Sequence, residues 1–161
     1  MDKMDNGDVA QVRERMWKKM AASPFVMVRL DDSFDHALPM TAILDEDANG
    51  KFWFYTSRDN RLASGGSAMA QFASKDHKLF ACISGRIVPE TDPAVIDRYW
   101  SPMVEAWFDG GRNDPSLLML RFELNDAEIW EGDESLTGKL KMLTGMKIKP
   151  DEAGRHVETT L

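Results

Sequence analysis

The sequence has little that could cross-link a fold: it contains one cysteine, Cys82, among 161 residues. A lone cysteine cannot form an intrachain disulfide, and structural zinc sites need several clustered ligands. The three histidines, His36, His77 and His156, lack metal-ligand spacing, so we expect them at the surface or in turns and expect no metal. Cys82 is interpreted as a small core residue, and a reducing, cytoplasmic location is expected.

Long apolar runs and long basic runs are also missing. No uninterrupted apolar segment reaches membrane-spanning length, and the acidic N-terminal segment lacks the apolar core of a signal peptide. With a net charge of −7 and no run of five lysines or arginines, the surface should repel nucleic acid and anionic membranes. We therefore expect one soluble domain over residues 1–161, with no nucleic-acid or membrane partner.

The motifs of common catalytic machineries are absent as well. The sequence has no P-loop, no Gly-x-Ser-x-Gly nucleophile elbow and no dinucleotide-binding fingerprint. Its carboxylates gather mostly in segments of turn composition, where solvation of a loop explains them. The sequence alone therefore assigns no catalytic residue.

What the sequence does contain is a series of short apolar segments separated by turn signals. A helix is predicted from Asp8 to about Ala22, because its apolar residues recur at helical spacing. Two later helices are predicted after Asp92 and Ser101, which are capping residues followed by proline. A helix broken by a glycine pair is expected within 61–74.

Strands are predicted from segments rich in β-branched and aromatic residues: 25–30, 36–44, 51–56, 77–88, 116–124 and 126–132. Gly85 is expected at a β-bulge. Hairpin spacing without parallel crossover units favours a mainly β fold, a six-stranded antiparallel closed or split barrel with flanking helices. Leucines suggest a short helix in a C-terminal tail extension, residues 132–161.

The stretch Gly50–Ala63, GKFWFYTSRDNRLA, joins an aromatic strand to a polar turn. Alternation puts Phe52 and Phe54 on one strand face and Trp53 and Tyr55 on the other, so we expect the core to cover one face and a partner or ligand the second. The residues that follow carry hydroxyl and guanidinium groups that suit a phosphate, and a solvated turn is the alternative: Thr56, Ser57, Arg58, Asn60 and Arg61.

Two further segments are rich in apolar side chains. Residues 95–108 form a nearly continuous apolar face that includes Trp100 and Trp107. A core stripe explains this pattern, and a flat aromatic ligand or a dimer partner is the alternative. In the segment HALPM, a packed strand explains the shared face of His36, Leu38 and Met40.

From Val9 to Trp130, these segments together resemble the general stress protein branch of the pyridoxamine 5′-phosphate oxidase-like, flavin-binding split barrels. The resemblance is carried by an ordered set of motifs: a Pro-Met strand, GKFWFYT, SGRIVPETDPAVIDRYW, WFDGGRNDPSLLMLRFEL and AEIW. It implies a six-stranded split barrel that forms a homodimer, with flavin mononucleotide (FMN), or alternatively flavin adenine dinucleotide (FAD), at the subunit interface.

The resemblance also implies roles for particular residues. The flavin ring or ribityl chain would be contacted by Tyr55 and Thr56, and the ring would be lined by Pro39, Met40 and Thr41. The phosphate would be held by Ser57, Asn60 and Arg61. The pocket wall would be shaped by Trp100 and Trp107, from the other subunit. This chain has Leu38 where the family usually has arginine, so we expect one cation fewer near the flavin and weaker binding.

Three functions stay open at this point. The first is a flavin-binding stress-response protein with oxidoreductase activity, in which the flavin does the chemistry. The second is a non-enzymatic dimeric flavin carrier or sensor, a binding module without turnover. The third is a reductase that uses a deazaflavin or a haem-related ligand. Classical pyridoxamine phosphate oxidation is not expected, because the sequence shows no second basic cluster for a second phosphate.

Overall fold

The computed structural model describes residues 6–45, 50–132 and 154–161. Its helices are α1 (Asn6–Ala22), α2 (Pro93–Arg98) and α3 (Pro102–Glu105), with a 3-10 turn, η1 (Gly111–Asn113). Its strands are β1 (Phe25–Leu30), β2 (Leu38–Thr41), β3 (Lys51–Ser57), β4 (Gly66–Ala73), β5 (Leu79–Pro89), β6 (Leu117–Gly132) and β7 (Gly154–Thr160). None of the helices in these ranges has the length and hydropathy needed to cross a bilayer.

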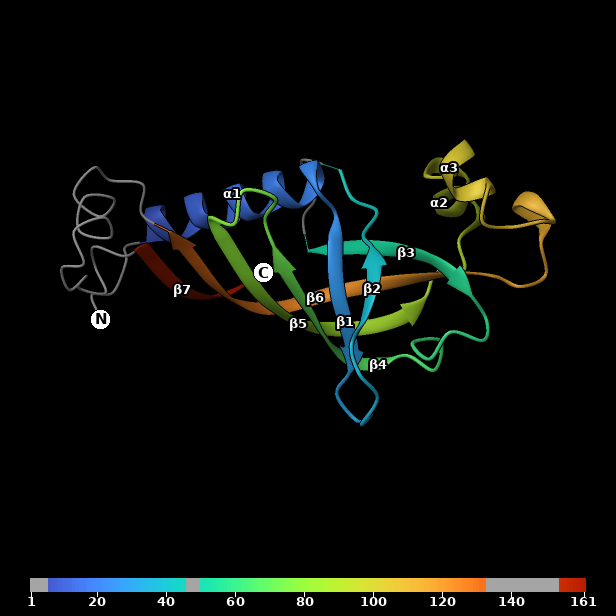
Figure 1. Cartoon of the computed structure of the whole chain (residues 1–161), viewed down its shortest axis with the longest axis horizontal. Helices are drawn as coiled ribbons and strands as arrows, with labels where there is room; N and C mark the ends of the chain where they lie inside the picture. The colour runs from blue at the N-terminus through green and yellow to red at the C-terminus, as the bar shows by residue number, and fades with distance from the viewer. Residues whose placement is uncertain (1–5, 46–49, 133–153) are drawn as a thin grey trace.

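The strands form one antiparallel sheet that curls round without closing (Figure 1). The strand order is β2-β1-β4-β5-β6-β3, and β7 pairs with the second half of β6. A single bridge between Ile43 and Trp53 joins the chain just after β2 to β3. The fold is therefore the mainly β, antiparallel split barrel that the sequence predicts, with a seventh strand in addition to six.

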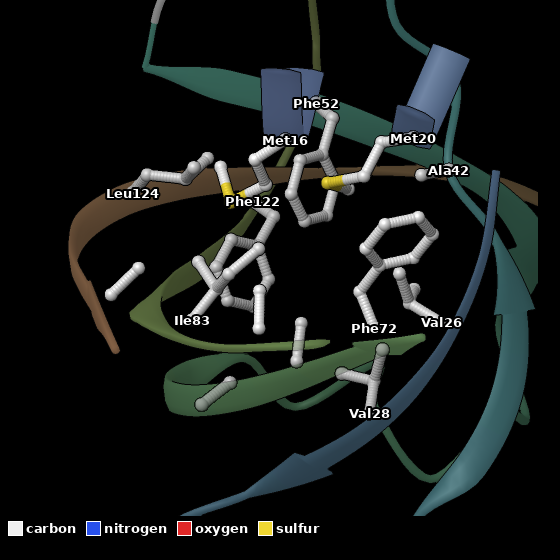
Figure 2. Packing of buried hydrophobic residues seen from close by; sticks show 14 of the residues in the cluster. Met16, Met20, Val26, Val28, Ala42, Phe52, Phe72, Ile83, Phe122 and Leu124 are labelled. Atoms are coloured by element: carbon white, nitrogen blue, oxygen red, sulfur yellow. The ribbon is translucent and has the colours of Figure 1, made fainter. Parts of the chain in front are cut away.

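The core lies inside the curled sheet and beneath α1. Val12, Met16 and Met20 recur at helical spacing on α1 and are fully buried. Figure 2 shows the two methionines lying over Phe52 and Phe122, whose rings stack with centroids 4.8 Å apart. Burying a side chain of this size contributes roughly 1.5–3 kcal/mol. The apolar face predicted for the first helix is thus what fixes α1 to the barrel.

The predicted bulge lies in the longest strand pair, between β5 and β6. Ser84 pairs with Asp126, but Gly85 pairs with Leu124, so Asn125 is an extra residue on β6. On β6 the buried residues are even-numbered from Leu120 to Leu124, just before the bulge, and odd-numbered after it, at Ala127 and Ile129. Because strand side chains alternate between faces, the even-numbered residues beyond the bulge face outward.

The broken helix expected within 61–74 is wrong. The segment is a turn followed by β4, in which every second residue from Ala68 to Phe72 is buried. Gly65 and Gly66 have φ of 68° and 110°, a backbone region that favours glycine, so they shape the turn and do not interrupt a helix.

The C-terminal third of the chain also differs from the expectation. The two strands predicted over 116–124 and 126–132 are one continuous strand, β6. Strand β7 was not predicted at all, and it pairs with β6 from Asp126 to Gly132. The short helix suggested by the leucines of the tail lies outside the described residues.

Both predicted helix caps are confirmed, but the core stripe over 95–108 is wrong for all its predicted members except Phe108, which is buried. The side chain of Asp92 accepts from the amide of Ala94 at 2.9 Å, and Ser101 Oγ accepts from the amide of Val104 at 3.3 Å. Neither α2 nor α3 contains a buried residue, and Trp107 just beyond α3 is 83% exposed. Figure 1 places both short helices on the β3 side of the molecule, away from α1 and the core.

Candidate functional site

The candidate site is the split between β2 and β3. Apart from the one bridge, β2 pairs only with β1, and β3 pairs only with β6 within the described part of the chain. Backbone N–H and C=O groups along such open edges can bind a ligand or a further chain. Six of the residues assigned by resemblance border this split: Pro39, Met40, Thr41, Tyr55, Thr56 and Ser57.

The β2 side of the split divides between two faces. Leu38 and Met40 are half-buried and pack against the core, whereas Pro39 and Thr41 are exposed. A flat ligand ring placed over the outer face would therefore contact Pro39 and Thr41. Met40 points to the opposite face and would support the strand from the core side.

The β3 side is covered in part by the segment around α2. Trp53 packs on Tyr99 with ring centroids 5.1 Å apart and is only 8% exposed. The expectation that a partner or ligand covers this face is thus wrong for Trp53, because residues of the same chain do so. Trp53 Nε1 is buried without a hydrogen-bond partner among the described residues.

Tyr55 is held by the same segment. Its hydroxyl donates to the carbonyl oxygen of Ile96 at 2.6 Å, and its ring meets Trp100 edge-on at 5.7 Å. Burial raises the pKa of Tyr55 to about 12, so the hydroxyl stays neutral and acts as a donor. The structure thus brings Tyr55 and Trp100 together, whereas Trp107 projects outward.

The polar turn after β3 is ordered by its own side chains. Ser57 Oγ donates to the carboxylate of Asp59, and Asn60 Oδ1 accepts from the amide of Leu62 at 2.8 Å. Arg58 Nε donates to the carbonyl of Pro115 at 3.0 Å. These bonds leave the side-chain NH2 of Asn60 as a hydrogen-bond donor that the described turn does not use.

Neither arginine of this turn pairs with an acid within the described residues; Arg58 donates to a carbonyl oxygen, and the Arg61 side chain makes no hydrogen bond there. The side chain of Arg61 is exposed. It lines a small hollow together with Arg29, Asp35, His36 and Leu38. The hollow brings Arg61 beside Leu38 at the start of β2.

A second surface was missed by the sequence reasoning. The outer face of the sheet from β2 through β1, β4 and β5 to β6 carries a groove of about 470 Å³ whose lining includes the exposed side chains of Phe25, Met27, Phe80 and Trp130. Cys82 also lines this groove and is only half-buried, so its assignment as a core residue is wrong. Segment 25–30 carried a sequence signal for this surface, because two of its three outward-facing residues, Phe25 and Met27, are apolar.

Comparison with known proteins identifies the fold family. A family model described as pyridoxamine 5′-phosphate oxidase like matches residues 11–151. The chain belongs to the pyridoxamine 5′-phosphate oxidase-like family. Among curated protein sequences, none matches the chain.

Solved structures of this family include general stress proteins. The chain is 42% identical to a general stress FMN/FAD binding protein from Xanthomonas citri, over 79% of this chain and 93% of that one, with a TM-score of 0.72. It is 42% identical to a general stress family protein from Xanthomonas campestris, over 83% and 94% of the two chains, with a TM-score of 0.71. A general stress protein 26 from Jannaschia is 26% identical, over 94% and 99%, with a TM-score of 0.77.

Proposed function

We propose that this oxidase-like family member is a flavin-binding stress-response protein, with FMN as the first candidate and FAD as the second. One observation carries the proposal: β2 and β3 leave open edges, and Arg61, which has no ion pair within the described residues, lines a hollow with Leu38 at the start of β2. The similarity to a protein from Xanthomonas citri that is described as FMN/FAD binding supports the same ligand class.

The residues at the split fit the two ends of a flavin. Arg61, with the amide group of Asn60, would bind the phosphate, because a guanidinium donates paired hydrogen bonds to phosphate oxygens. Ser57 would add a hydroxyl if it exchanged its bond to Asp59 for the phosphate. The ring and ribityl chain would lie along the strand edges, against the remaining predicted residues of β2 and β3: Pro39, Met40, Thr41, Tyr55 and Thr56.

A homodimer would complete the pocket. The outer groove exposes Phe25, Phe80 and Trp130, and large contiguous apolar surface of this kind is typical of protein interfaces. Trp107 is exposed in one chain, as expected for a residue that reaches a second subunit. We propose that Trp100 lines the pocket from its own chain and that Trp107 lines it from the partner. We also propose that the protein acts in the reducing cytoplasm.

The bound flavin would supply the redox chemistry, and the protein would supply position and shielding from water. Among the described residues at the split, no group is placed as a proton donor or acceptor for a substrate, since the Tyr55 hydroxyl is engaged with Ile96. That engagement favours a second candidate, a flavin carrier or sensor without turnover. Steady-state assays with NADH or NADPH and an electron acceptor separate the two.

The proposal is tested by titrating the purified protein with FMN, FAD and riboflavin. Arg61→Ala should weaken FMN binding by about 1.5–3 kcal/mol, or about 10- to 150-fold, because it removes a hydrogen bond to a charged group. Arg61→Lys should retain much of the affinity. Riboflavin, which lacks the phosphate, should bind equally to wild-type protein and Arg61→Ala.

Arg58→Ala is the matched control, because Arg58 lies in the same turn but donates to the Pro115 carbonyl. It should leave FMN affinity within a factor of about two, in line with surface substitutions near ±0.5 kcal/mol. A protein that is monomeric by sedimentation and binds neither flavin would refute the proposal. Equal losses in the two arginine variants would remove Arg61 from the phosphate site.

A further inference from the structure

A second cluster of polar side chains lies on the outer face of β6 and β7, apart from the split. Sheet register sets Glu128 directly opposite Glu158 and sets Trp130 directly opposite His156. All four face outward, since the buried residues of these two strands, Ile129 and Val157 among them, lie on the other face. The cluster exists because the bulge in β6 turns its even-numbered residues outward.

Three of these side chains converge on one point. His156 Nε2 lies 2.7 Å from Glu128 Oε1, and one ligand atom from each of Glu128, His156 and Glu158 lies within 4.8 Å of the others. The His156 ring stacks on Trp130, with centroids 5.1 Å apart and 6° between the planes. This stacking holds the imidazole plane so that Nε2 points at the carboxylates.

The charges of the cluster are poorly balanced. Two carboxylates directly opposite each other on neighbouring strands repel, which destabilises a strand pair. Within the described residues, the ion pair of Glu128 is with His156, and Glu158 has none. Both carboxylates line a depression of about 420 Å³ that also includes Asp126, so water can reach them. A divalent cation would offset this repulsion.

We propose that Glu128, His156 and Glu158 form a three-ligand site for a divalent first-row transition metal, with Zn²⁺ as the representative ion. One imidazole and two carboxylates are ligand types that Zn²⁺ accepts, and three protein ligands leave a fourth position open toward the depression. Zinc bonds of about 2.0–2.2 Å place tetrahedral ligand atoms about 3.3–3.6 Å apart. The Glu158 side chain is exposed and that of Glu128 half-buried, so changes of their χ angles would have to bring the carboxylates to that spacing.

Bound metal would fasten β7 to β6, because one ligand comes from β6 and two come from β7. The three ligands are not among the residues assigned to the split, although Trp130, which stacks on His156, also lines the outer groove proposed as the dimer interface. Zinc binding by the three ligands and flavin binding at the split are measured separately. The two proposals can therefore fail separately.

The test is titration calorimetry of the full-length, tag-free protein with zinc chloride, supported by metal analysis of the dialysed protein. We expect one Zn²⁺ per chain. His156→Gln and Glu158→Gln should each weaken binding at least about tenfold, since even the loss of outer-shell partners of a metal ligand costs about 10- to 100-fold. The controls are His36→Gln and Glu14→Gln, exposed residues outside the cluster, and they should bind like wild type.

Hydrogen exchange of the wild-type protein and of His156→Gln gives a second measurement. Zinc should slow exchange of the β7 amides, Gly154–Thr160, and should have no such effect in His156→Gln. The proposal is overturned by the absence of stoichiometric binding, by one metal per two chains, or by equal losses in the cluster variants and the controls. Unchanged exchange in β7 on saturation with zinc would also overturn it.

Discussion

Gly85 faces the bulge where β5 and β6 change register, and it has no room for a side chain. A Cβ atom there would lie 2.3 Å from the carbonyl oxygen of Glu123 and 2.5 Å from Cε1 of Phe122. The first is backbone within the β5–β6 ladder, and the second belongs to a fully buried ring, so neither can yield without cost. We therefore expect Gly85→Ala to destabilise the protein by about 1–3 kcal/mol, the range for an overpacked core.

For a domain of this size, that loss lowers the melting temperature by roughly 2–12 °C, at about 2–4 °C per kcal/mol. Thermal and denaturant unfolding followed by circular dichroism measure it. Gly132→Ala is the matched control on the same strand pair, because the nearest atom to its Cβ would be the Lys78 carbonyl oxygen at 3.6 Å, an ordinary contact. If Gly85→Ala were as stable as Gly132→Ala, the reasoning about the bulge would be refuted.

Two further predictions concern pH. Burial raises the pKa of Tyr55 to about 12 and also raises the pKa of Tyr99. The stability that the two neutral hydroxyls contribute is therefore complete below the pKa of an unfolded tyrosine, about 10, and is lost as pH rises beyond that pKa. Ultraviolet absorbance at about pH 10 should show little tyrosinate in the native protein and about half ionisation in denaturant, and coincident titrations would contradict this. The hydrogen bond from Lys19 Nζ, 2.7 Å long, is the main cause that holds the pKa of Asp76 below its ordinary value. That contribution to stability is present above the unfolded pKa, about 3.9, and is lost as pH falls below it. Asp76→Asn should therefore make stability fall less steeply with acid than in the wild type. An unchanged acid dependence would exclude a stabilising Lys19–Asp76 pair.

Part of the fold could be read from local patterns. The face of α1, the caps at Asp92 and Ser101 and the bulge at Gly85 are each set by residues close together in the sequence. Local preference agrees with the tertiary structure at these places, so the predictions hold. The family resemblance rests on the same kind of ordered local motif, and the family model and the solved structures confirm it.

Other parts depend on contacts that no local pattern encodes. The segment 61–74 has both helical and strand periodicity, and pairing with β1 and β5 decides for the strand. Residues 95–108 look like a core stripe, but short helices that cover Trp53 and Tyr55 from outside leave Met103 and Trp107 exposed. Apolar character alone does not say which side of a sheet a residue will meet.

The sequence by itself determined the antiparallel β character, the starts of α2 and α3 and the family, because each follows from propensity or motif within a few residues. Only the tertiary structure decided where the sheet splits and which surfaces bring polar and ionisable side chains together. His156 and Glu128 are 28 residues apart in the chain and become neighbours only when β7 pairs with β6 past the bulge. Strand register acts over such separations, and it has no signature in local sequence.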